Sequence, residues 1–404
     1  MKKQKKRWMK FRHVIVRNIA FSVLYPYSKW KYGITADRFK EQGDRPYLVL
    51  YNHQTPFDQF FVGMSFKGAV YYLATEDIFS NGWVSSLIRW LVAPIPIKKQ
   101  TTDVSAVKNC IRVSREGGTI CIAPEGNRTY SGKTEYMSPA IASLARILKL
   151  PIALYCIEGG YGVQPRWSDV VRKGKIHAHV SRVIEPEEYA ALTDEELFAI
   201  IENGLMVNEG ISDGAFRSNR RAEYLERAIY VCPYCGLSEF HSSGNEIECK
   251  KCHRKIEYGT DKKLTGVGFS FPFEYVTEWY DYQKEYVNSL DVKQYTQEPL
   301  FRDNASLSEV IVYKHKQLLR KQADITLYGD RILIDEGSEN ALVFPFADVA
   351  AVSVLGRNKL NIYHDDKVYQ IKGGKRFNAL KYVNICFRCK NTIRGDLNGK
   401  FLGL

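Results

Sequence analysis

The feature that most constrains the fold of this chain is a set of four cysteines near its middle. Cys232-Pro-Tyr-Cys235-Gly is followed by twelve residues and then by Cys249-Lys-Lys-Cys252. Thiolates in two such pairs form knuckles that close a tetrahedral zinc site, and a Cys-Pro-x-Cys-Gly opening is typical of zinc ribbons. Four thiolates leave no position for substrate. We therefore expect a structural zinc, which replaces a core that about 28 residues cannot build.

The other cysteines and nearby histidines do not extend this pattern. His241 and His253 lie close in sequence, but four thiolates already suffice, so we do not expect either as a ligand. Cys386 and Cys389 have no second pair and are expected to be buried apolar residues. Paired Cys-x-x-Cys spacing is unusual for disulfides, and no signal-peptide pattern is found at the N-terminus. Both observations favour a reducing cytosol.

Hydrophobic patterning divides the rest of the chain. With 404 residues and 45% hydrophobic content, two or three domains are expected. Short apolar runs alternate with helical stretches from Tyr47 to about Ile184, which predicts an α/β fold with a mixed sheet flanked by helices. The predicted strands are YLVLYN (47–52), AVYYLA (69–74), GTICIAPEG (118–126) and PIALYCIEGG (151–160). A charged helical stretch from Thr193 to Arg227 is expected to close this domain.

The C-terminal part reads as mainly β. Residues 273–290 are predicted to be helical, and a final helix is expected over residues 377–388. Between them, turn signals separate apolar runs, which favours antiparallel strands and possible closure into a small barrel of the pleckstrin-homology kind. The predicted strands lie within VIVYKHKQLL (310–319), DITLYGDRILI (324–334), ALVFPF (341–346), KLNIYH (359–364) and KVYQIK (367–372).

The N-terminal segment concentrates the basic charge. The net charge is +13, and residues 1–36 contain ten Lys or Arg and no acid. On a helical wheel, apolar and basic side chains separate onto opposite faces, which is typical of a helix lying in the plane of an anionic membrane surface. The apolar face comprises Trp8, Phe11, Ile15 and Ile19, and the basic face Lys6, Lys10, His13 and Arg17. An uninterrupted apolar run of about 20 residues, as needed to span a bilayer, is absent from the sequence.

Two other interpretations of this segment stay open. The helix could pack on its own domain with a solvated basic face, or the segment could be a nucleic-acid tail. We expect no nucleic-acid partner, because the sequence lacks a recognisable Arg/aromatic recognition surface. The expected location is the cytoplasmic face of a membrane, with peripheral or interfacial attachment.

A catalytic constellation is predicted in Asn52-His53-Gln54-Thr55-Pro56-Phe57-Asp58, directly after the first predicted strand. His53 then leaves the strand end, and Asp58 lies in the first turn of a helix that begins near Pro56, which turns its carboxylate back toward the imidazole. An imidazole can take a hydroxyl proton at neutral pH, and a carboxylate can hold its tautomer during acyl transfer from a thioester to an alcohol. Taken alone, the spacing fits a capping or core histidine equally well.

A second polar motif, Ala123-Pro124-Glu125-Gly126-Asn127-Arg128-Thr129, follows the third predicted strand. Gly126 keeps its turn tight, Arg128 can bind phosphate through its planar fork, and Glu125 can accept hydrogen bonds from polyol hydroxyls. Pro94-Ile95-Pro96-Ile97-Lys98-Lys99 ends in two cations suited to a second phosphate contact. Each motif alone also fits an ordinary turn or a solvated ion pair.

In combination and in this order, these motifs and the segment from Leu150-Pro151-Ile152 to Gly159 resemble the glycerolipid acyltransferase family, typified by 1-acylglycerol-3-phosphate acyltransferases. The resemblance covers roughly residues 45–190. It implies a catalytic His-Asp pair and a set of residues that bind the phosphate and glycerol of the acceptor. These are His53 and Asp58 for the pair, and Glu125, Gly126, Arg128, Lys99 and Lys98 for the acceptor.

Three positions depart from the family pattern. Asn127 stands where the family has a small hydroxyl residue, Lys99 where it usually has arginine, and Leu154 in place of the second proline of the last block. The departures concern the acceptor site and leave the catalytic pair unchanged.

The resemblance implies an O-acyltransferase of phospholipid biosynthesis. It would move a fatty acyl group from acyl-CoA or acyl-carrier protein to the hydroxyl of a lysophospholipid such as 1-acylglycerol-3-phosphate, with no catalytic cofactor. The expected division is a membrane-contacting segment (1–45), an acyltransferase domain (46–228), a zinc ribbon (229–258) and a mainly β domain (259–404). The alternative is a non-catalytic adaptor that docks on lipid and carries a zinc ribbon.

Overall fold

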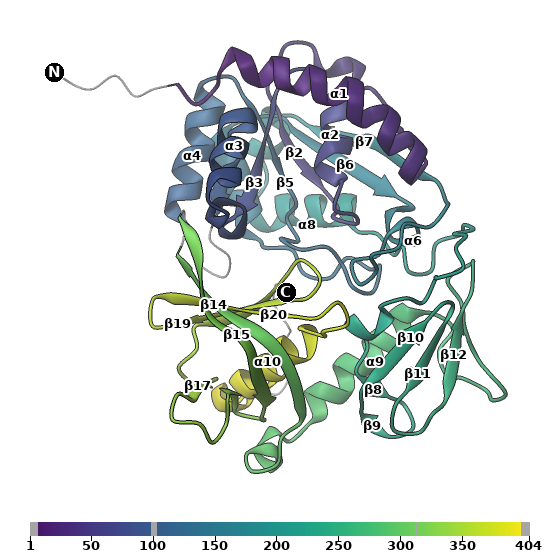
Figure 1. Ribbon diagram of the computed structural model, residues 1–404. Coiled ribbons are helices and arrows are strands. Elements are labelled where there is room, and N and C mark those ends of the chain that lie inside the picture. The colour runs from purple at the N-terminus through teal and green to yellow at the C-terminus, as the bar shows by residue number, and fades with distance from the viewer. Residues whose placement is uncertain (1–6, 98–102, 312–313, 397–404) are drawn as a thin grey trace.

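The computed structural model describes residues 7–97, 103–311 and 314–396 (Figure 1). An α/β domain occupies the top of the view, with helix α1 (Phe11–Tyr32) lying across it. A small β unit lies at the lower right. A mainly β domain with the C-terminal helix α10 (Leu380–Arg394) lies at the lower left.

The α/β domain is built on a seven-stranded sheet in the order β1-β7-β6-β2-β5-β3-β4. β7 pairs antiparallel with β6, and the other neighbouring pairs are parallel, so the sheet is mixed as predicted. Its strands are β1 (Ile34–Ala36), β2 (Leu48–Tyr51), β3 (Val70–Thr75), β4 (Ile95–Ile97), β5 (Thr119–Ile122), β6 (Ile152–Glu158) and β7 (Ile176–Ile184). The four strands expected from the sequence correspond to β2, β3, β5 and β6.

Helices cover both faces of this sheet, which explains the continuous apolar runs. Leu48 and Leu50 of β2 pack with α4 (Val104–Arg115), α5 (Ala140–Leu148) and α8 (Asp194–Leu205). Val49 and Tyr51 point to the opposite face and pack with α1 and α2 (Asp58–Ser65). Successive strand residues alternate between faces, so a strand covered on both sides has no polar position. Each fully buried aliphatic side chain stabilises the fold by roughly 1.5–3 kcal/mol.

The prediction of a helical stretch from Thr193 to Arg227 was wrong for its second half. α8 ends at Leu205, and the chain then runs irregularly until the short 3-10 helix η3 (Leu225–Arg227). Gly210 lies so close to Thr277 that an added Cβ would fall 1.8 Å from the threonine hydroxyl, and Gly214 has a φ of 150°. Gly210 permits this close contact because it has no side chain, and the φ of Gly214 is incompatible with a continuing helix.

The cysteine-containing unit shares its core with the C-terminal domain. It comprises the pair β8 (Val231–Cys232) and β9 (Gly236–Leu237), and a sheet of β10 (Phe240–Ser243), β11 (Glu246–Cys249), β12 (Lys255–Tyr258) and β13 (Leu264–Gly266). Phe240 packs against Trp279 of α9 (Val276–Ser289), with ring centroids 5.4 Å apart. The same buried cluster continues to Ile325 and Val383.

The C-terminal domain is an antiparallel seven-stranded sheet closed by α10, as predicted in outline. The order is β17-β16-β15-β14-β20-β19-β18. The strands are β14 (Phe301–Ile311), β15 (His315–Leu327), β16 (Arg331–Ile334), β17 (Leu342–Pro345), β18 (Ala351–Leu355), β19 (Lys359–His364) and β20 (Lys367–Gly373).

Two details of this domain were predicted wrongly. The run 310–319 is not one strand, because Ile311 pairs with His315 and the chain reverses between them, without a glycine or proline to signal the turn. The final helix extends six residues past Arg388, to Arg394. Cys386 and Cys389 lie in that helix and are buried as expected.

The C-terminal domain contacts the α/β domain through the largely buried carboxylate of Asp77, which is 15% exposed. Asp77 lies in the 3-10 helix η2 (Glu76–Ser80), which follows β3. It pairs with Lys316 of β15 and Lys359 of β19, and accepts a 3.3 Å hydrogen bond from Gln370. Burial alone would raise the pKa of Asp77, but the two lysines outweigh it and the pKa is lowered.

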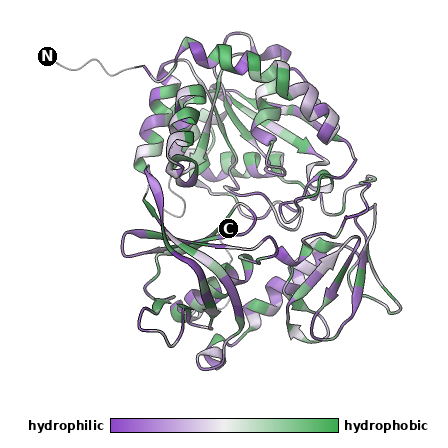
Figure 2. Cartoon of the chain, viewed as in Figure 1, coloured by the Kyte–Doolittle hydropathy of each residue, from purple (hydrophilic) through white to green (hydrophobic). Residues whose placement is uncertain are grey.

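Helix α1 exposes Phe11, Ile15 and Ile19 of the predicted apolar face, whereas Trp8 precedes the helix and packs against the core. Figure 2 shows hydrophobic positions recurring along α1 and along α3 (Trp83–Val92). His13 is buried and Arg17 donates to the carbonyls of Gly63 and Phe66, so part of the basic face is turned toward the protein. The helix therefore packs on its own domain, as the first alternative expected, but its basic face is partly buried rather than solvated. Within the described residues, no helix is both long and apolar enough to cross a membrane.

Candidate active site

The candidate active site forms where β2 ends and α2 begins. His53 follows β2 by two residues, and Asp58 is the first residue of α2. The Nδ1 atom of His53 lies 2.7 Å from Oδ2 of Asp58, with the imidazole 21% exposed and the carboxylate fully buried. The structure thus brings the predicted pair together, leaving Nε2 of His53 as the ring nitrogen available to a substrate.

Backbone and hydroxyl donors hold Asp58 in place. Its carboxylate accepts hydrogen bonds from the backbone N–H of Gln54 at 2.6 Å and of Thr55 at 2.9 Å, and from the Thr55 hydroxyl at 2.6 Å. Charge-assisted bonds of this kind stabilise the ionised carboxylate. With His53, they fix both carboxylate oxygens.

Asn52 anchors the strand end that carries His53. Its side-chain amide donates to the carbonyl of Ile157 and accepts from the N–H of the same residue, at 2.8 and 2.7 Å. These two hydrogen bonds join the ends of β2 and β6. Asn52 is therefore a positioning residue for the turn that follows.

The surroundings favour neutral imidazole. Burial lowers the pKa of His53 below its ordinary value of 6.5, the hydrogen bond and charge of Asp58 oppose this, and the charges of Arg128 and Arg166 add to the lowering. A neutral histidine at pH 7 is in the form that a general base requires.

The Glu125 motif lies beside the pair, in the loop after β5. Oε1 of Glu125 accepts a 2.9 Å hydrogen bond from the backbone N–H of His53, and the residue is 8% exposed. Burial raises the pKa of Glu125 to about 8. Gly126, at φ 67°, adopts the left-handed conformation that makes the turn.

Arg128 lies close enough to the pair for its charge to act on His53. Burial, followed by the charges of Arg166 and Arg357, lowers the pKa of Arg128 to about 9. Arg166 donates to the backbone carbonyl of Arg128 at 2.8 Å and stacks over Tyr130. Sequence reasoning missed Arg166 and Arg357 because both lie outside the motifs.

The remaining motif residues are only partly placed. Lys98 and Lys99 lie outside the described residues, whereas Ile95 and Ile97 form the predicted extended segment, β4. Leu154, at the position of the missing proline, is fully buried in β6.

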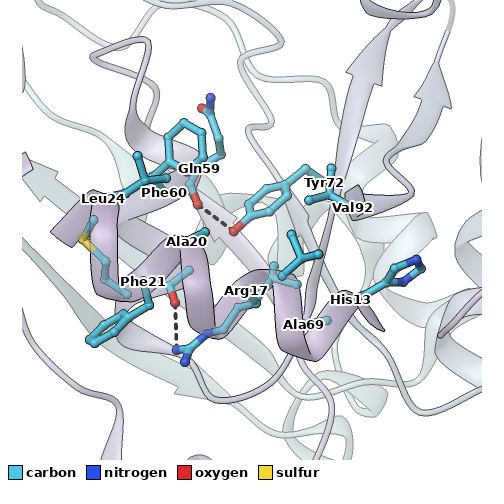
Figure 3. Close-up of a pocket in the computed structure, with 14 residues that line it drawn as sticks. His13, Arg17, Ala20, Phe21, Leu24, Gln59, Phe60, Ala69, Tyr72 and Val92 are labelled. Atoms are coloured by element: carbon cyan, nitrogen blue, oxygen red, sulfur yellow. Dashed lines mark hydrogen bonds between the residues drawn. The ribbon is translucent and has the colours of Figure 1, made fainter. Parts of the chain in front are cut away.

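An apolar pocket opens beside α2, between α1 and the sheet (Figure 3). Gln59 and Phe60, which directly follow Asp58, form part of its wall. The hydroxyl of Tyr72 donates to the Gln59 carbonyl at 2.6 Å, which ties α2 to β3. The lining from α1 is His13, Val16, Arg17, Ala20, Phe21 and Leu24. The pocket is thus apolar in its main part and begins within one helical turn of the His-Asp pair.

The four predicted metal ligands come together away from this site. The Sγ atoms of Cys232 and Cys252 are 3.8 Å apart, and those of Cys235 and Cys249 are 3.6 Å apart. Tetrahedral coordination with Zn–S distances of about 2.3 Å gives S–S separations of about 3.8 Å. The cluster could therefore hold a metal ion. It includes neither His241 nor His253.

Helices α1 and α3, which contact each other, both carry exposed apolar side chains. The two helices touch through Arg12, which donates to the carbonyl of Trp90 at 2.8 Å and lies over its ring. Phe11 and Trp30 are about 80% exposed, and Trp83 is 76% exposed. We call the set of these exposed apolar side chains the apolar platform. Its members are Phe11, Ile15, Ile19, Val23 and Trp30 of α1, and Trp83, Leu87 and Trp90 of α3.

Comparisons with known proteins agree with the motifs. Residues 34–158 match the family model described as Acyltransferase. The 1-acyl-sn-glycerol-3-phosphate acyltransferase of Bacillus subtilis (strain 168) is 22% identical over 136 residues, which are 34% of this chain and 65% of that protein. A chloroplastic enzyme of the same name from Brassica napus is 23% identical over 206 residues, 49% of this chain and 58% of that protein.

A solved structure is also similar. The 1-acyl-sn-glycerophosphate acyltransferase from Thermotoga maritima matches 48% of this chain and 75% of its own, with 20% identity and a TM-score of 0.39. The chain spans less than two thirds of the length of each of the two curated relatives.

Proposed function

We propose that this chain, which belongs to the glycerolipid acyltransferase family, transfers a fatty acyl group from a thioester donor to the hydroxyl of a lysophospholipid. The observation that carries the proposal is the His53–Asp58 pair, 2.7 Å apart at the end of β2, with its carboxylate fully buried. The relatives' names favour 1-acylglycerol-3-phosphate as acceptor. The donor is proposed to be acyl-CoA or acyl-carrier protein. Such a reaction belongs to phospholipid biosynthesis.

In the proposed mechanism, Nε2 of His53 takes the proton of the acceptor hydroxyl while its oxygen attacks the thioester carbonyl. Asp58 accepts the Nδ1–H bond, holds the tautomer and stabilises the imidazolium as it forms. When the C–S bond breaks, the imidazolium gives its proton to the leaving thiolate. The products are an ester and a free thiol, the histidine is neutral again, and no catalytic cofactor is required.

The acceptor is proposed to lie over the loop after β5. Arg128 would grip its phosphate, and Glu125 and Gly126 would shape the floor beneath the glycerol. Oε1 of Glu125 already accepts the backbone N–H of His53. A hydroxyl of the substrate would therefore have to donate to Oε2. Lys98 and Lys99 remain proposed as further phosphate contacts.

The pocket of Figure 3 is proposed to receive an acyl chain. Its wall is mainly aliphatic and aromatic, and it includes Gln59 and Phe60, the two residues that follow Asp58 in α2. Burying methylene groups there would gain about 0.8 kcal/mol each.

The apolar platform is proposed to lie on an anionic membrane surface, at the cytoplasmic face. Exposed tryptophan and aliphatic side chains suit the interfacial region, and Arg7, Lys29, Lys31 and Arg89 lie among the flanking cations. Replacing both Ile15 and Ile19 by serine should weaken binding to phosphatidylglycerol vesicles by roughly tenfold per residue.

The matched control is the pair Leu318→Ser and Val343→Ser, which changes exposed apolar residues of the C-terminal domain. Equal vesicle binding by the two double variants would refute this placement of the membrane.

The cysteine cluster is proposed to hold a structural zinc. The four thiols fit its coordination in kind and spacing, and Cys235 also lies 3.3 Å from the Ser238 hydroxyl. In this proposal the metal stabilises the unit from 229 to 258 without taking part in acyl transfer.

The deciding experiment incubates the purified protein with a panel of lysolipids and both classes of thioester donor, and identifies products by mass spectrometry. His53→Ala should lower turnover by a factor on the order of 10²–10⁴ while acceptor binding is kept. His177→Ala, which removes another carboxylate-paired histidine of the same domain, is the control. Acyl transfer that is unaffected by His53→Ala would end the enzymatic proposal and leave the non-catalytic adaptor.

A further inference from the structure

We propose that the C-terminal β domain completes the acceptor site, with Arg357 and Arg128 holding one phosphomonoester between them. This inference rests on the proposed function for the identity of the acceptor, but not for the existence of the anion site. It assigns to the C-terminal domain a part in substrate selection.

Two buried guanidinium atoms lack a partner. Nη1 of Arg128 and Nε of Arg357 are both inaccessible to solvent, and neither has a hydrogen-bond acceptor within the described part of the chain. Buried N–H groups are rarely left unsatisfied, because each loses its hydration without compensation. An oxyanion that accepts from both would satisfy them.

The structure brings the two arginines together across the domain boundary. Arg357 lies in the turn between β18 and β19, three residues after Val354. Arg166 contacts both domains: it donates to the carbonyl of Arg128 at 2.8 Å and to the carbonyl of Val354 at 3.4 Å. The β18–β19 turn is therefore packed against the loop that carries Arg128. The charge of Arg357 is close enough to contribute to the lowered pKa of Arg128.

Arg357 is held in position from both ends. The neighbouring Asn358 donates to the Gly373 carbonyl at 2.8 Å, which fixes the turn. Nη1 of Arg357 donates to Oδ1 of Asp169 at 2.5 Å. Asp169 also binds Arg227 through both carboxylate oxygens, at 3.1 and 2.9 Å. The guanidinium is thus oriented before an anion binds, which reduces the entropy lost on binding.

The cluster carries more positive than negative charge. Asp169 is shared by Arg227 and Arg357, and across residues 7–97, 103–311 and 314–396 neither Arg128 nor Arg166 forms an ion pair with a carboxylate. Adjacent guanidiniums of this kind repel one another and favour a doubly charged ligand. The headgroup of a lysolipid with a terminal phosphate has this charge, whereas a neutral monoacylglycerol does not.

The test measures binding of inorganic phosphate by calorimetry at constant ionic strength, independently of turnover. Arg357→Gln and Arg128→Ala should each weaken phosphate binding by roughly tenfold or more, because each removes a charge-assisted hydrogen bond. Arg357→Lys should fall between wild type and Arg357→Gln, since it keeps the charge and loses the fork. The control is Arg320→Gln, which removes a similarly exposed arginine of the same domain that pairs with Asp335.

Acyl transfer provides the second arm. With 1-acylglycerol-3-phosphate, Arg357→Gln should raise the acceptor KM by a similar factor with little change in donor KM, and with monoacylglycerol it should behave as Arg320→Gln does. Phosphate binding equal in Arg357→Gln and Arg320→Gln, or absent from the wild type, would overturn the inference. Arg357-dependent phosphate binding without acyl transfer to any acceptor would instead leave the anion site standing and refute the proposed function.

Discussion

Replacing Asp58 by asparagine tests the centre of the proposed mechanism with the smallest change of shape. The carboxylate accepts bonds from His53, from two backbone N–H groups and from the Thr55 hydroxyl. An amide offers one oxygen, and its NH2 group must then face a donor. At least one buried contact becomes a donor–donor clash, or the His53 ring is left in the wrong tautomer.

The expected effect is large for turnover and moderate for stability. Loss of the tautomer and of imidazolium stabilisation should lower kcat by a factor on the order of 10³–10⁴. One unsatisfied buried donor should lower the free energy of unfolding by about 1–3 kcal/mol. Acceptor KM should change little, because the contacts proposed for phosphate come from Arg128.

The assay combines steady-state kinetics with urea unfolding of the same preparations. Asp37→Asn is the matched control, since Asp37 also pairs with a histidine, His177, at 2.9 Å, but both side chains are about half exposed. It should change neither kcat nor stability appreciably. A folded Asp58→Asn protein with wild-type kcat would show that the pair is structural and that another group takes the proton.

Two titrations and one metal site give further predictions. Because the pKa of His53 is lowered and its neutral form is the active one, kcat/KM should be constant near pH 7 and fall tenfold per pH unit only below a value under 6.5; a decline centred above 6.5 would contradict this. Glu125 has a raised pKa, so its contribution to stability is complete below its ordinary pKa and is lost as pH rises through about 8. Glu125→Gln should flatten that loss between about pH 4.5 and 8, as measured by thermal unfolding against pH. Metal analysis should give one zinc per chain, abolished by Cys232→Ser with Cys249→Ser; a folded, zinc-free wild type would exclude the structural zinc.

Local patterns predicted the α/β domain well because its determinants are local. The strands of the sheet core are buried on both faces, so they appear as short apolar runs, and His53 and Asp58 are close in sequence as well as in space. The cysteine spacing likewise encodes its own geometry, since two short knuckles need little from the rest of the chain. In both cases, residues that are close in the sequence are also in contact in the structure.

The errors arose where tertiary contacts decide the backbone. The charged residues after Leu205 suggested a helix, but Gly210 packs against Thr277, far along the chain, and Gly214 has a φ of 150°, which a helix does not adopt. The pairing of Ile311 with His315 was also missed, because no glycine or proline stands between them in the sequence. The orientation of α1 also depends on acceptors that sequence does not reveal. Arg17 binds carbonyls at the end of α2, which turns this part of the basic face toward the protein, whereas Ile15 and Ile19 are exposed.

The most consequential feature hidden from the sequence is where the C-terminal domain sits. β2, β5 and β3 are parallel neighbours, so their carboxyl ends lie at one edge of the sheet, and His53, Glu125 and Asp77 follow these ends in turn. Lys316 and Lys359 reach Asp77 at this edge, and Arg357 reaches Asp169, in the loop that follows β6 and the short helix α6 (Gly160–Val163). The C-terminal domain therefore covers the edge at which acyl transfer is proposed, as Figure 1 shows for the arrangement of the domains. In the proposed function, the acceptor headgroup then lies at the boundary between the two domains. Arg357, about 230 positions after Arg128 in the sequence, would then help to select the headgroup of the acceptor.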